Sequence, residues 1–423
     1  MKVLWVTNLP IAHLREMLKL PLGQSGGWME TSYDALKEAY DMKLGVATIY
    51  GGTELLHDAA DGNDFYAVPT QQVIGEYNPK DENNLSQWRG VIHDFKPDII
   101  QIWGTEYSMG LCAQYASKGI PSVVYIQGLV SMIAKHCMDG ISLKEQIVNA
   151  SFYEVWKRKC LWQQKKKFEK SADIEKEILS NANAVIVESD WCGGICSMIA
   201  PQIKVYKSDL PINPVFSSIE WNYEKVEKNS IFTVSGGYPV KGHHILFEAL
   251  FIVKKRYPNV KLYIPGASRL LRKLSFKEKI QLSSYDRILI KKIKQYGLQD
   301  NIVLLGRLTP SEMAERMSTC HCFVMPSVIE NHSSSLIEAM MLGLPTISSF
   351  VGGLNSYYND GENGFFYRAD EPEHLASLIM SYFCDDGLCK RISHQGMLDQ
   401  RKQRLSINLE EDFVRIYESI IKV

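Results

Sequence analysis

Short apolar runs alternate along this chain with longer stretches in which apolar residues recur at helical spacing. Apolar runs of about four to eight residues bounded by turn residues predict buried strands, and apolar residues three or four positions apart predict amphipathic helices. Their alternation predicts parallel sheets whose strands are connected by helices. The series begins at Lys2 and starts again at Ser230, so we predict two Rossmann-like α/β domains, each with a doubly wound parallel sheet.

The predicted strands form two sets of five. They are residues 2–7, 43–49, 99–103, 122–127 and 184–188 in the first half, and 230–235, 261–265, 301–305, 322–325 and 345–349 in the second. Residues 204–227 contain Pro211 and Pro214 and no clear period, which indicates the connection between the domains. We therefore expect domains at 1–212 and 213–403, with an amphipathic helix in 404–423 that packs back toward the first domain.

Composition and charge narrow the class of protein. With 423 residues, of which 45% are hydrophobic and 22% charged, the chain resembles folded globular proteins. Its net charge of −1 argues against nucleic acid as a partner, because nucleic-acid binding needs a basic surface. It has no apolar run of membrane-spanning length and no cleavable leader, so we expect a cytoplasmic protein. The nine scattered cysteines indicate reduced thiols and lack standard zinc spacing, so no metal is expected.

One helical stretch, Phe152 to Lys170, is unusually basic. It contains seven Lys or Arg residues together with Trp156, Trp162 and Phe168. This combination predicts a peripheral contact with an anionic membrane at its inner face. A solvated helix face whose aromatic residues enter the core fits the same pattern, so both interpretations stay open.

The segment 325–345 has the pattern of a strand, a polar loop, a helix and a turn. Ser333 or a neighbour can cap the helix, and Gly343 ends it. The amides at such a helix start form an anion site suited to a pyrophosphate. Glu330 precedes this site and Glu338 lies inside the helix, and carboxylates accept hydroxyl hydrogen bonds strongly. The residues that would line the anion site are Asn331, His332, Ser333, Ser334 and Ser335.

This segment resembles the retaining glycosyltransferases of family 4, also called group 1, with their two glutamates separated by seven residues. The Pro-Ser-x-x-Glu context, Glu-Ala-Met, the Gly-x-Pro turn, a Gly-Gly turn at 351–353 and an Asp-Gly-x-Asn-Gly loop at 360–364 carry the resemblance. The resemblance implies the GT-B fold, in which two Rossmann-like domains face an interdomain cleft. It also implies that Glu330 contacts donor sugar hydroxyls and that Glu338 contacts ribose hydroxyls.

Two glycine-containing loops extend the resemblance. Residues 232–244 are similar to the family's strand, Gly-Arg-Leu loop and Lys-Gly helix start, which implies that Lys241 neutralises the leaving diphosphate. The usual arginine is absent, and Gly236 and Gly237 stand there instead, where backbone amides can approach the donor. Gly26 and Gly27 resemble the glycine-rich loop that faces the donor from the first domain.

A second departure follows the predicted strand 122–127. Gln127 occupies the place where many family members have a histidine, and it can hydrogen-bond a sugar hydroxyl but cannot act as an acid or base. One strand earlier, Trp103 and Glu106 are candidates for holding an acceptor sugar, although Glu106 equally fits a helix start. Gly306 and Arg307 stand where the family grips the nucleotide base, although Arg307 also fits an ordinary surface position.

These features together predict an enzyme that moves a sugar from a nucleotide-sugar donor to an acceptor hydroxyl with retention of configuration. The resemblance implies a UDP- or GDP-linked donor, no separate cofactor, and a saccharide or lipid-linked saccharide acceptor in cell-surface polysaccharide or glycoconjugate synthesis. The absence of an Asp-x-Asp motif favours a metal-independent hexosyltransferase-like reaction. Two alternatives remain open, a non-catalytic GT-B partner subunit of another transferase and a sugar-nucleotide epimerase.

Overall fold

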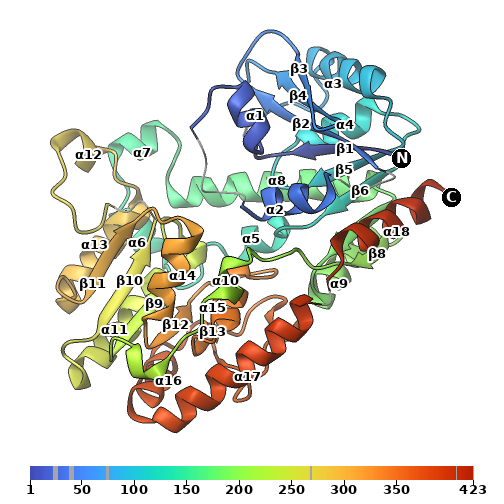
Figure 1. Ribbon diagram of the computed structural model, residues 1–423. Coiled ribbons are helices and arrows are strands. Elements are labelled where there is room, and N and C mark those ends of the chain that lie inside the picture. The colour runs from blue at the N-terminus through green and yellow to red at the C-terminus, as the bar shows by residue number, and fades with distance from the viewer. Residues whose placement is uncertain (22–26, 38–41, 73–75, 267–268, 406, 423) are drawn as a thin grey trace. The chain divides into compact units, whose positions relative to one another are not determined.

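The computed structural model describes residues 1–21, 27–37, 42–72, 76–266, 269–405 and 407–422 (Figure 1). Contacts divide the chain into two compact units. The first unit comprises residues 1–131, 169–211 and 407–423, and the second unit comprises residues 132–168 and 212–406. No helix among the described residues is both long and apolar enough to cross a membrane.

The first unit contains an eight-stranded sheet in the order β3-β4-β2-β1-β5-β6-β7-β8. The strands are β1 (Lys2–Thr7), β2 (Lys43–Tyr50), β3 (Leu56–Ala60), β4 (Asn63–Pro69), β5 (Ile99–Trp103), β6 (Ser122–Tyr125), β7 (Ala184–Val187) and β8 (Lys204–Lys207). All neighbouring pairs are parallel except β3 and β4, which form an antiparallel hairpin. Strands β1 and β5 lie in the middle of the sheet, where both of their faces are covered. Their residues are therefore mostly hydrophobic.

Helices pack on this sheet and complete its core. They are α1 (Ala12–Met17), α2 (Gly27–Leu36), α3 (Glu82–Phe95), α4 (Met109–Ala116), α9 (Asp190–Ile199) and α18 (Leu409–Ile421), with α5 (Val130–His136) and α8 (Leu161–Asn181) crossing between the units. Although α18 comes last in the sequence, it packs in the first unit (Figure 1). Its apolar face, Leu409, Phe413, Ile416, Tyr417 and Ile420, is buried against the sheet core. The Tyr417 hydroxyl donates a hydrogen bond to Gln101 on β5.

The second unit contains a fully parallel six-stranded sheet in the order β11-β10-β9-β12-β13-β14. Its strands are β9 (Ser230–Thr233), β10 (Lys261–Pro265), β11 (Ile302–Gly306), β12 (Cys322–Met325), β13 (Thr346–Ser349) and β14 (Phe365–Tyr367). Its helices are α6 (Leu143–Val148), α7 (Phe152–Trp156), α10 (Val215–Ser218), η2 (Tyr223–Lys225), η3 (Pro239–Lys241), α11 (His243–Arg256), α12 (Phe276–Ile280), α13 (Ser284–Tyr296), α14 (Pro310–Ser318), α15 (Ser334–Leu342), η4 (Leu354–Ser356), α16 (Pro372–Cys384) and α17 (Asp386–Leu405). Central strands β9 and β12 bring the loops after them to one edge of the sheet.

Residues 132–168 group with the second unit, whereas the sequence assigned them to a first domain of residues 1–212. The contacts of Glu154 on α7 explain the difference. Its buried carboxylate accepts hydrogen bonds from the Ser284 amide (2.7 Å) and hydroxyl (2.9 Å). It also forms an ion pair with Arg287 on α13 (2.9 Å). These contacts join residues distant in sequence, which hydrophobic periodicity does not reveal.

Candidate functional site

The loop between β12 and α15 carries Glu330 and is held from one side by the segment after β9. The Val328 amide donates a hydrogen bond to the Val240 carbonyl (2.9 Å). Gly242 lies against the same loop with φ = +63°, and a Cβ atom there would stand 1.7 Å from the Pro326 carbonyl oxygen. Only glycine fits this contact. Gly242 of the Lys-Gly motif is therefore a packing requirement of the Glu330 loop.

The turn after β13 holds the same loop from another side. The Gly353 amide donates a hydrogen bond to the Glu330 carbonyl (3.3 Å). Gly352 has φ = +58°, and a Cβ atom there would lie 1.6 Å from that carbonyl oxygen. The two motifs that the sequence places far apart, Lys-Gly and Gly-Gly, thus converge on the backbone of the Glu330 loop.

The Glu330 carboxylate forms an ion pair with Lys241. The Lys241 Nζ atom lies 2.6 Å from Glu330 Oε1, and the Ser327 hydroxyl donates to the same oxygen at 2.7 Å. The Lys241 and Glu330 side chains are 23% and 14% exposed, so the pair is largely shielded from water. Burial opposes the charge on Lys241, but the nearby Glu330 carboxylate and Tyr238 together raise its pKa. Lys241 therefore stays cationic in this pair at neutral pH.

The N-terminus of α15 follows directly after Glu330. The Ser333 hydroxyl caps this helix by accepting from the Leu336 amide (3.3 Å), and the Ser333 amide donates to the Tyr357 hydroxyl (3.3 Å). Asn331 is buried, and His332 lies 3.3 Å from the Arg404 guanidinium and packs on the Tyr357 ring. The structure thus brings the predicted anion-site residues together at a capped helix start, with Ser334 exposed and Ser335 partly buried.

Glu338 lies on α15 and is partly buried. Burial raises the pKa of Glu338 from 4.5 to about 8. In the unfolded chain this group ionises near its ordinary pKa. The folded protein therefore binds a proton more tightly than the unfolded chain does, and ionisation of Glu338 opposes folding between about pH 4.5 and pH 8.

We expect Glu338→Gln to stabilise the fold in a pH-dependent way. At pH 4 the variant and the wild type should unfold alike, because both side chains are then neutral. As the pH rises toward 8, the variant should gain about 2 kcal/mol of unfolding free energy, since partial exposure screens part of the burial penalty. Urea unfolding at several pH values measures this difference. The exposed Glu362→Gln is the matched control, and an equal gain in both variants would contradict the assignment.

A cavity of about 200 Å³ opens beside the loop after β9. It is lined by Gly236 and Gly237, by the buried His243, and by Arg269 from the segment after β10. Burial lowers the pKa of His243 to about 4, so this imidazole is neutral at physiological pH. Sequence reasoning missed Arg269, because no motif marks it and only the fold brings it to the two glycines.

The predicted base-binding pair lies at the end of β11. Gly306 has φ = +72°, and its carbonyl accepts a hydrogen bond from the Gly266 amide (2.6 Å). Arg307 follows with an exposed side chain. The pair therefore lies at the carboxyl edge of the same sheet that carries the Glu330 loop.

The predicted residues of the first unit differ in how accessible they are. Gly26 lies outside the described residues, and Gly27 begins α2. Gln127 follows β6 and is partly buried. Glu106 follows β5. Burial raises the pKa of Glu106 to about 7, and the nearby Glu175 carboxylate adds to the shift. The Glu106 carboxyl thus can exchange a proton near neutral pH, a property that the sequence did not reveal.

The prediction that Trp103 holds an acceptor sugar is wrong. Its side chain is 1% exposed and belongs to the core of the first unit. The Trp103 ring packs against Trp5 (4.8 Å between ring centroids) and Tyr125 (4.9 Å). A fully packed indole has no face left for a sugar, so Glu106 alone remains as the candidate on this strand end.

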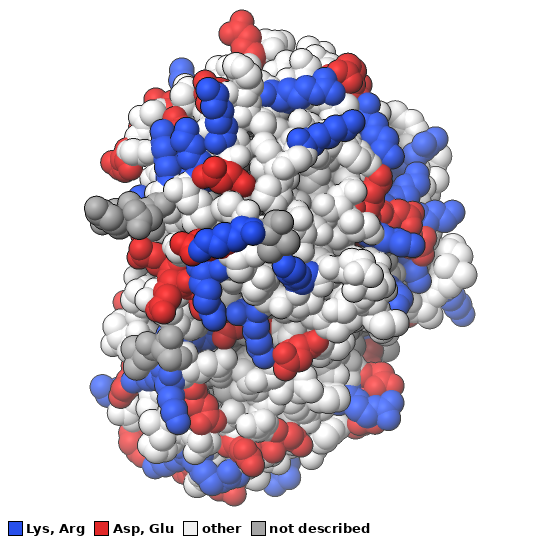
Figure 2. All heavy atoms as spheres, turned by 90° about the vertical axis from the view of Figure 1, so that its right-hand side faces the viewer, with Lys and Arg blue, Asp and Glu red and all other residues white. Residues whose placement is uncertain are grey.

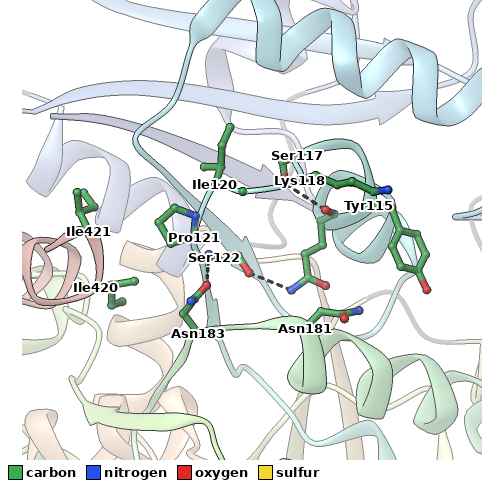
Figure 3. A pocket seen from close by; sticks show the side chains of 12 residues that line it. Tyr115, Ser117, Lys118, Ile120, Pro121, Ser122, Asn181, Asn183, Ile420 and Ile421 are labelled. Carbon is green, nitrogen blue, oxygen red and sulfur yellow. Dashed lines mark hydrogen bonds between the residues drawn. The ribbon is translucent and has the colours of Figure 1, made fainter. Parts of the chain in front are cut away.

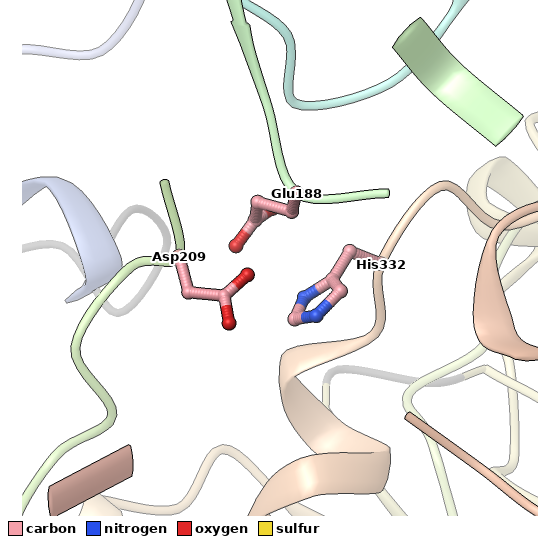
Figure 4. Close-up of side chains that lie close together, drawn as sticks. All are labelled: Glu188, Asp209 and His332. Carbon is pink, nitrogen blue, oxygen red and sulfur yellow. The ribbon is translucent and has the colours of Figure 1, made fainter. Parts of the chain in front are cut away.

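Two further features of the first unit lie at opposite edges of its sheet. Glu188 and Asp209 follow β7 and β8 at the carboxyl edge (Figure 4), and Glu188 accepts a hydrogen bond from the Leu210 amide (3.3 Å). A cavity of about 660 Å³ lies at the amino ends of β6 and β7, where Ser122, Asn183 and Gln114 form hydrogen bonds (Figure 3). Open α/β sheets bind ligands at their carboxyl edges, so this cavity is not part of the candidate site.

Comparison with known sequences gives a match in the second unit. Residues 217–398 match the family model described as "Glycosyl transferases group 1". An uncharacterized glycosyltransferase of Methanocaldococcus jannaschii is 32% identical over 114 residues, which are 26% of this chain and 32% of that protein. The matched segment thus spans about a third of that relative's own length.

Solved structures resemble the whole chain. Sucrose-phosphate synthase from Thermosynechococcus elongatus has a TM-score of 0.71 at 14% identity, covering 100% of this chain and 99% of its own. The Anabaena protein HepE, solved in complex with UDP and glucose, has a TM-score of 0.67 at 16% identity and covers 100% of both chains. These similarities confirm the predicted fold class, GT-B with two parallel-sheet α/β units.

Proposed function

We propose that this chain, whose residues 217–398 match the group 1 glycosyl transferases, transfers a sugar from a nucleotide donor to an acceptor hydroxyl with retention of configuration. The observation that carries the proposal is the Lys241–Glu330 ion pair beside the capped N-terminus of α15. A cation and a helix start together suit a diphosphate, and the adjacent carboxylate suits sugar hydroxyls. The proposal includes a UDP- or GDP-linked donor. It also includes a role for the reaction in polysaccharide or glycoconjugate synthesis.

The contacts of the pair suggest how the work is divided. The Lys241 ammonium has three N–H donors and donates one hydrogen bond to Glu330 Oε1, so two donors can bind phosphate oxygens. Among the described residues, the two hydrogen bonds to the Glu330 carboxylate both fall on Oε1, so Oε2 is the oxygen proposed for donor hydroxyls. Glu338, further along α15, would accept hydrogen bonds from the ribose hydroxyls. The contact between Lys241 and the phosphate oxygens would strengthen as negative charge builds on the diphosphate.

In the proposed step, the bond between the anomeric carbon and the diphosphate oxygen breaks, and its electron pair leaves with the phosphate. The acceptor hydroxyl oxygen bonds to the anomeric carbon on the same face. Its proton passes to the leaving phosphate oxygen. Lys241 and the amides of Ser334 and Ser335 stabilise the charge on that phosphate, and Gln127 contributes a hydrogen bond to a sugar hydroxyl.

Release of nucleoside diphosphate by the purified chain tests the proposal. UDP-, GDP- and ADP-linked sugars are first screened for thermal stabilisation, with a CMP-linked sugar, which has only one phosphate, for comparison, because a ligand that binds the folded state raises its stability. The stabilising donor is then incubated with a mixture of saccharide acceptors, and the anomeric configuration of the product is determined by NMR. Binding without turnover would favour a non-catalytic partner subunit, and conversion of the donor sugar without acceptor would favour an epimerase.

We further propose that Arg269 supplies the positive charge that the Gly236-Gly237 loop lacks. The side chain lines the cavity beside those glycines, and its Nη1 atom lies 3.4 Å from the Gln281 carbonyl oxygen. Arg269→Ala should raise the KM for the donor about tenfold, the effect of losing one exposed charge-assisted contact of about 1.4 kcal/mol. Arg272→Ala, a few residues away, is the control. An unchanged KM in Arg269→Ala would exclude the role.

A further inference from the structure

Exposed apolar side chains are concentrated in two short segments of the second unit, residues 143–160 and 271–280. Among the described residues, 17 large hydrophobic side chains are exposed, and nine of them lie in these segments. Phe152 is 88% exposed and Phe276 is 81% exposed. The nine are Leu143, Ile147, Val148, Phe152, Val155, Trp156, Leu271, Phe276 and Ile280. Such a concentration of apolar surface marks an interaction site.

The guanidinium of Arg287 holds the two segments side by side. It donates to the Asn149 carbonyl (3.2 Å), between α6 and α7, and to the Glu154 carboxylate (2.9 Å). Its other nitrogen donates to the carbonyls of Lys279 and Ile280 (both 3.3 Å), at the end of α12. Figure 1 shows α7 and α12 as neighbours. We call their combined outer face the apolar–basic surface.

The exposed charges on this surface all have one sign. Eight Lys or Arg side chains of the two segments are exposed, namely Lys144, Lys157, Arg158, Lys159, Arg272, Lys273, Lys277 and Lys279. The three acidic residues, Glu145, Glu154 and Glu278, are buried or partly buried. The segments thus carry a formal charge of +5, whereas the whole chain carries −1. On the face drawn in Figure 2, by contrast, basic and acidic side chains are interspersed.

We propose that the apolar–basic surface binds an anionic lipid bilayer. Aromatic and aliphatic side chains enter the boundary between headgroups and acyl chains, while lysine and arginine meet the negative headgroups. Trp156 is suited to this boundary, and the Lys157 ammonium lies 4.3 Å from the centre of its ring. A second copy of the chain fits poorly, because it would place like charges opposite each other.

The surface differs from the basic stretch that the sequence indicated. Of residues 152–170, α7 belongs to it, whereas Cys160 and Leu161 are buried and the aromatic residues Trp162 and Phe168 on α8 are partly buried. The surface extends instead to α6 and α12, and α12 lies more than 100 positions further along the chain. Neither interpretation of residues 152–170 included α12, which the fold brings beside α7.

Flotation with vesicles tests the proposal without any measurement of sugar transfer. The full chain should float with vesicles of phosphatidylcholine and phosphatidylglycerol in equal parts, and remain below with phosphatidylcholine alone. The triple variant Phe152→Ser, Trp156→Ser, Phe276→Ser should lose at least tenfold in vesicle binding. A second variant, Lys157→Glu with Lys277→Glu and Lys279→Glu, should lose binding most strongly at low salt, because screened charges contribute less.

Matched controls come from exposed positions outside the surface. Met198→Ser removes a side chain that is 84% exposed on α9, and Lys204→Glu reverses a charge on β8, so both should float like the wild type. Failure of the wild type to float, or equal flotation of the triple variant, would overturn the proposal. So would a wild-type dimer in sedimentation that the triple variant converts to a monomer, since a second copy would then cover the surface.

Discussion

Glu330→Gln is expected to lower the rate of nucleoside diphosphate release by about 100-fold or more, the effect of removing one preorganised electrostatic contact in an active site. The substitution keeps the shape of the side chain and removes its charge. Lys241 then lacks its partner at 2.6 Å, and the oxygen proposed for sugar hydroxyls becomes a weaker acceptor. Steady-state rates with the stabilising donor measure the effect, and circular dichroism checks that the fold is intact.

The double variant Glu330→Gln, Lys241→Met separates two explanations for that loss. If Glu330 acts only by holding Lys241, each single variant should already show the full loss and the double variant should add nothing. If Glu330 also contacts the donor, the double variant should be slower than either single variant, although less than additively, because the two groups are in contact. The exposed Glu373→Gln is the control. Unchanged turnover in Glu330→Gln would refute the proposed function.

Gly352→Ala is expected to lower both stability and activity. The new methyl group would start 1.6 Å from the Glu330 carbonyl oxygen, so the turn or the Glu330 loop must move. We expect a loss of about 2–4 kcal/mol in the free energy of unfolding, the range for a clash combined with an unfavourable backbone conformation. The displaced loop should also lower turnover below the level that stability alone explains. Urea unfolding and rates at saturating donor measure the two effects.

Gly361→Ala is the matched control for this substitution. Gly361 has φ = +74°, so alanine suffers a similar backbone penalty, but the nearest atom to its Cβ would be 4.0 Å away. The control should lose only about 1 kcal/mol, the cost of alanine at a positive φ. Equal losses in the two variants would mean that the close approach to Glu330 is of no consequence.

Hydrophobic pattern predicted the central strands well and the edges poorly. β1, β5, β10 and β12 begin and end where the sequence places them, because each is a short apolar run in the interior of a sheet. β3, β4 and β8 were missed. The edge strands β3 and β8 carry exposed polar side chains and lack that signal, whereas β4 is buried throughout but begins with the polar residues Asn63 and Asp64. β14 was missed because it has only three residues, and its place depends on pairing with β13.

The candidate site was predicted as far as its motifs extend. The segment 325–345 carries its helix start and its glutamates in one continuous string, so local sequence sufficed there. Arg269 could not be predicted from the sequence, because only the fold brings it to the cavity that Gly236 lines. Trp103 failed for a related reason, since the last residue of a strand can face either the loop above or the core below. The raised pKa of Glu106 comes mainly from burial and in part from Glu175, which lies on α8, far along the chain, and both depend on the fold.

The position of α18 has a consequence for the order in which the units are completed during synthesis. The first unit needs the buried face of residues 409–420 to close its core, and those residues leave the ribosome about 400 positions after β1. At about 5–20 residues per second, its earliest strands wait roughly 20 to 80 seconds for that helix. The second unit, which ends at residue 406, has all of its residues available earlier. The first unit, whose strands are made first, therefore completes its core after the second unit. We expect the first unit to depend on chaperones during that interval.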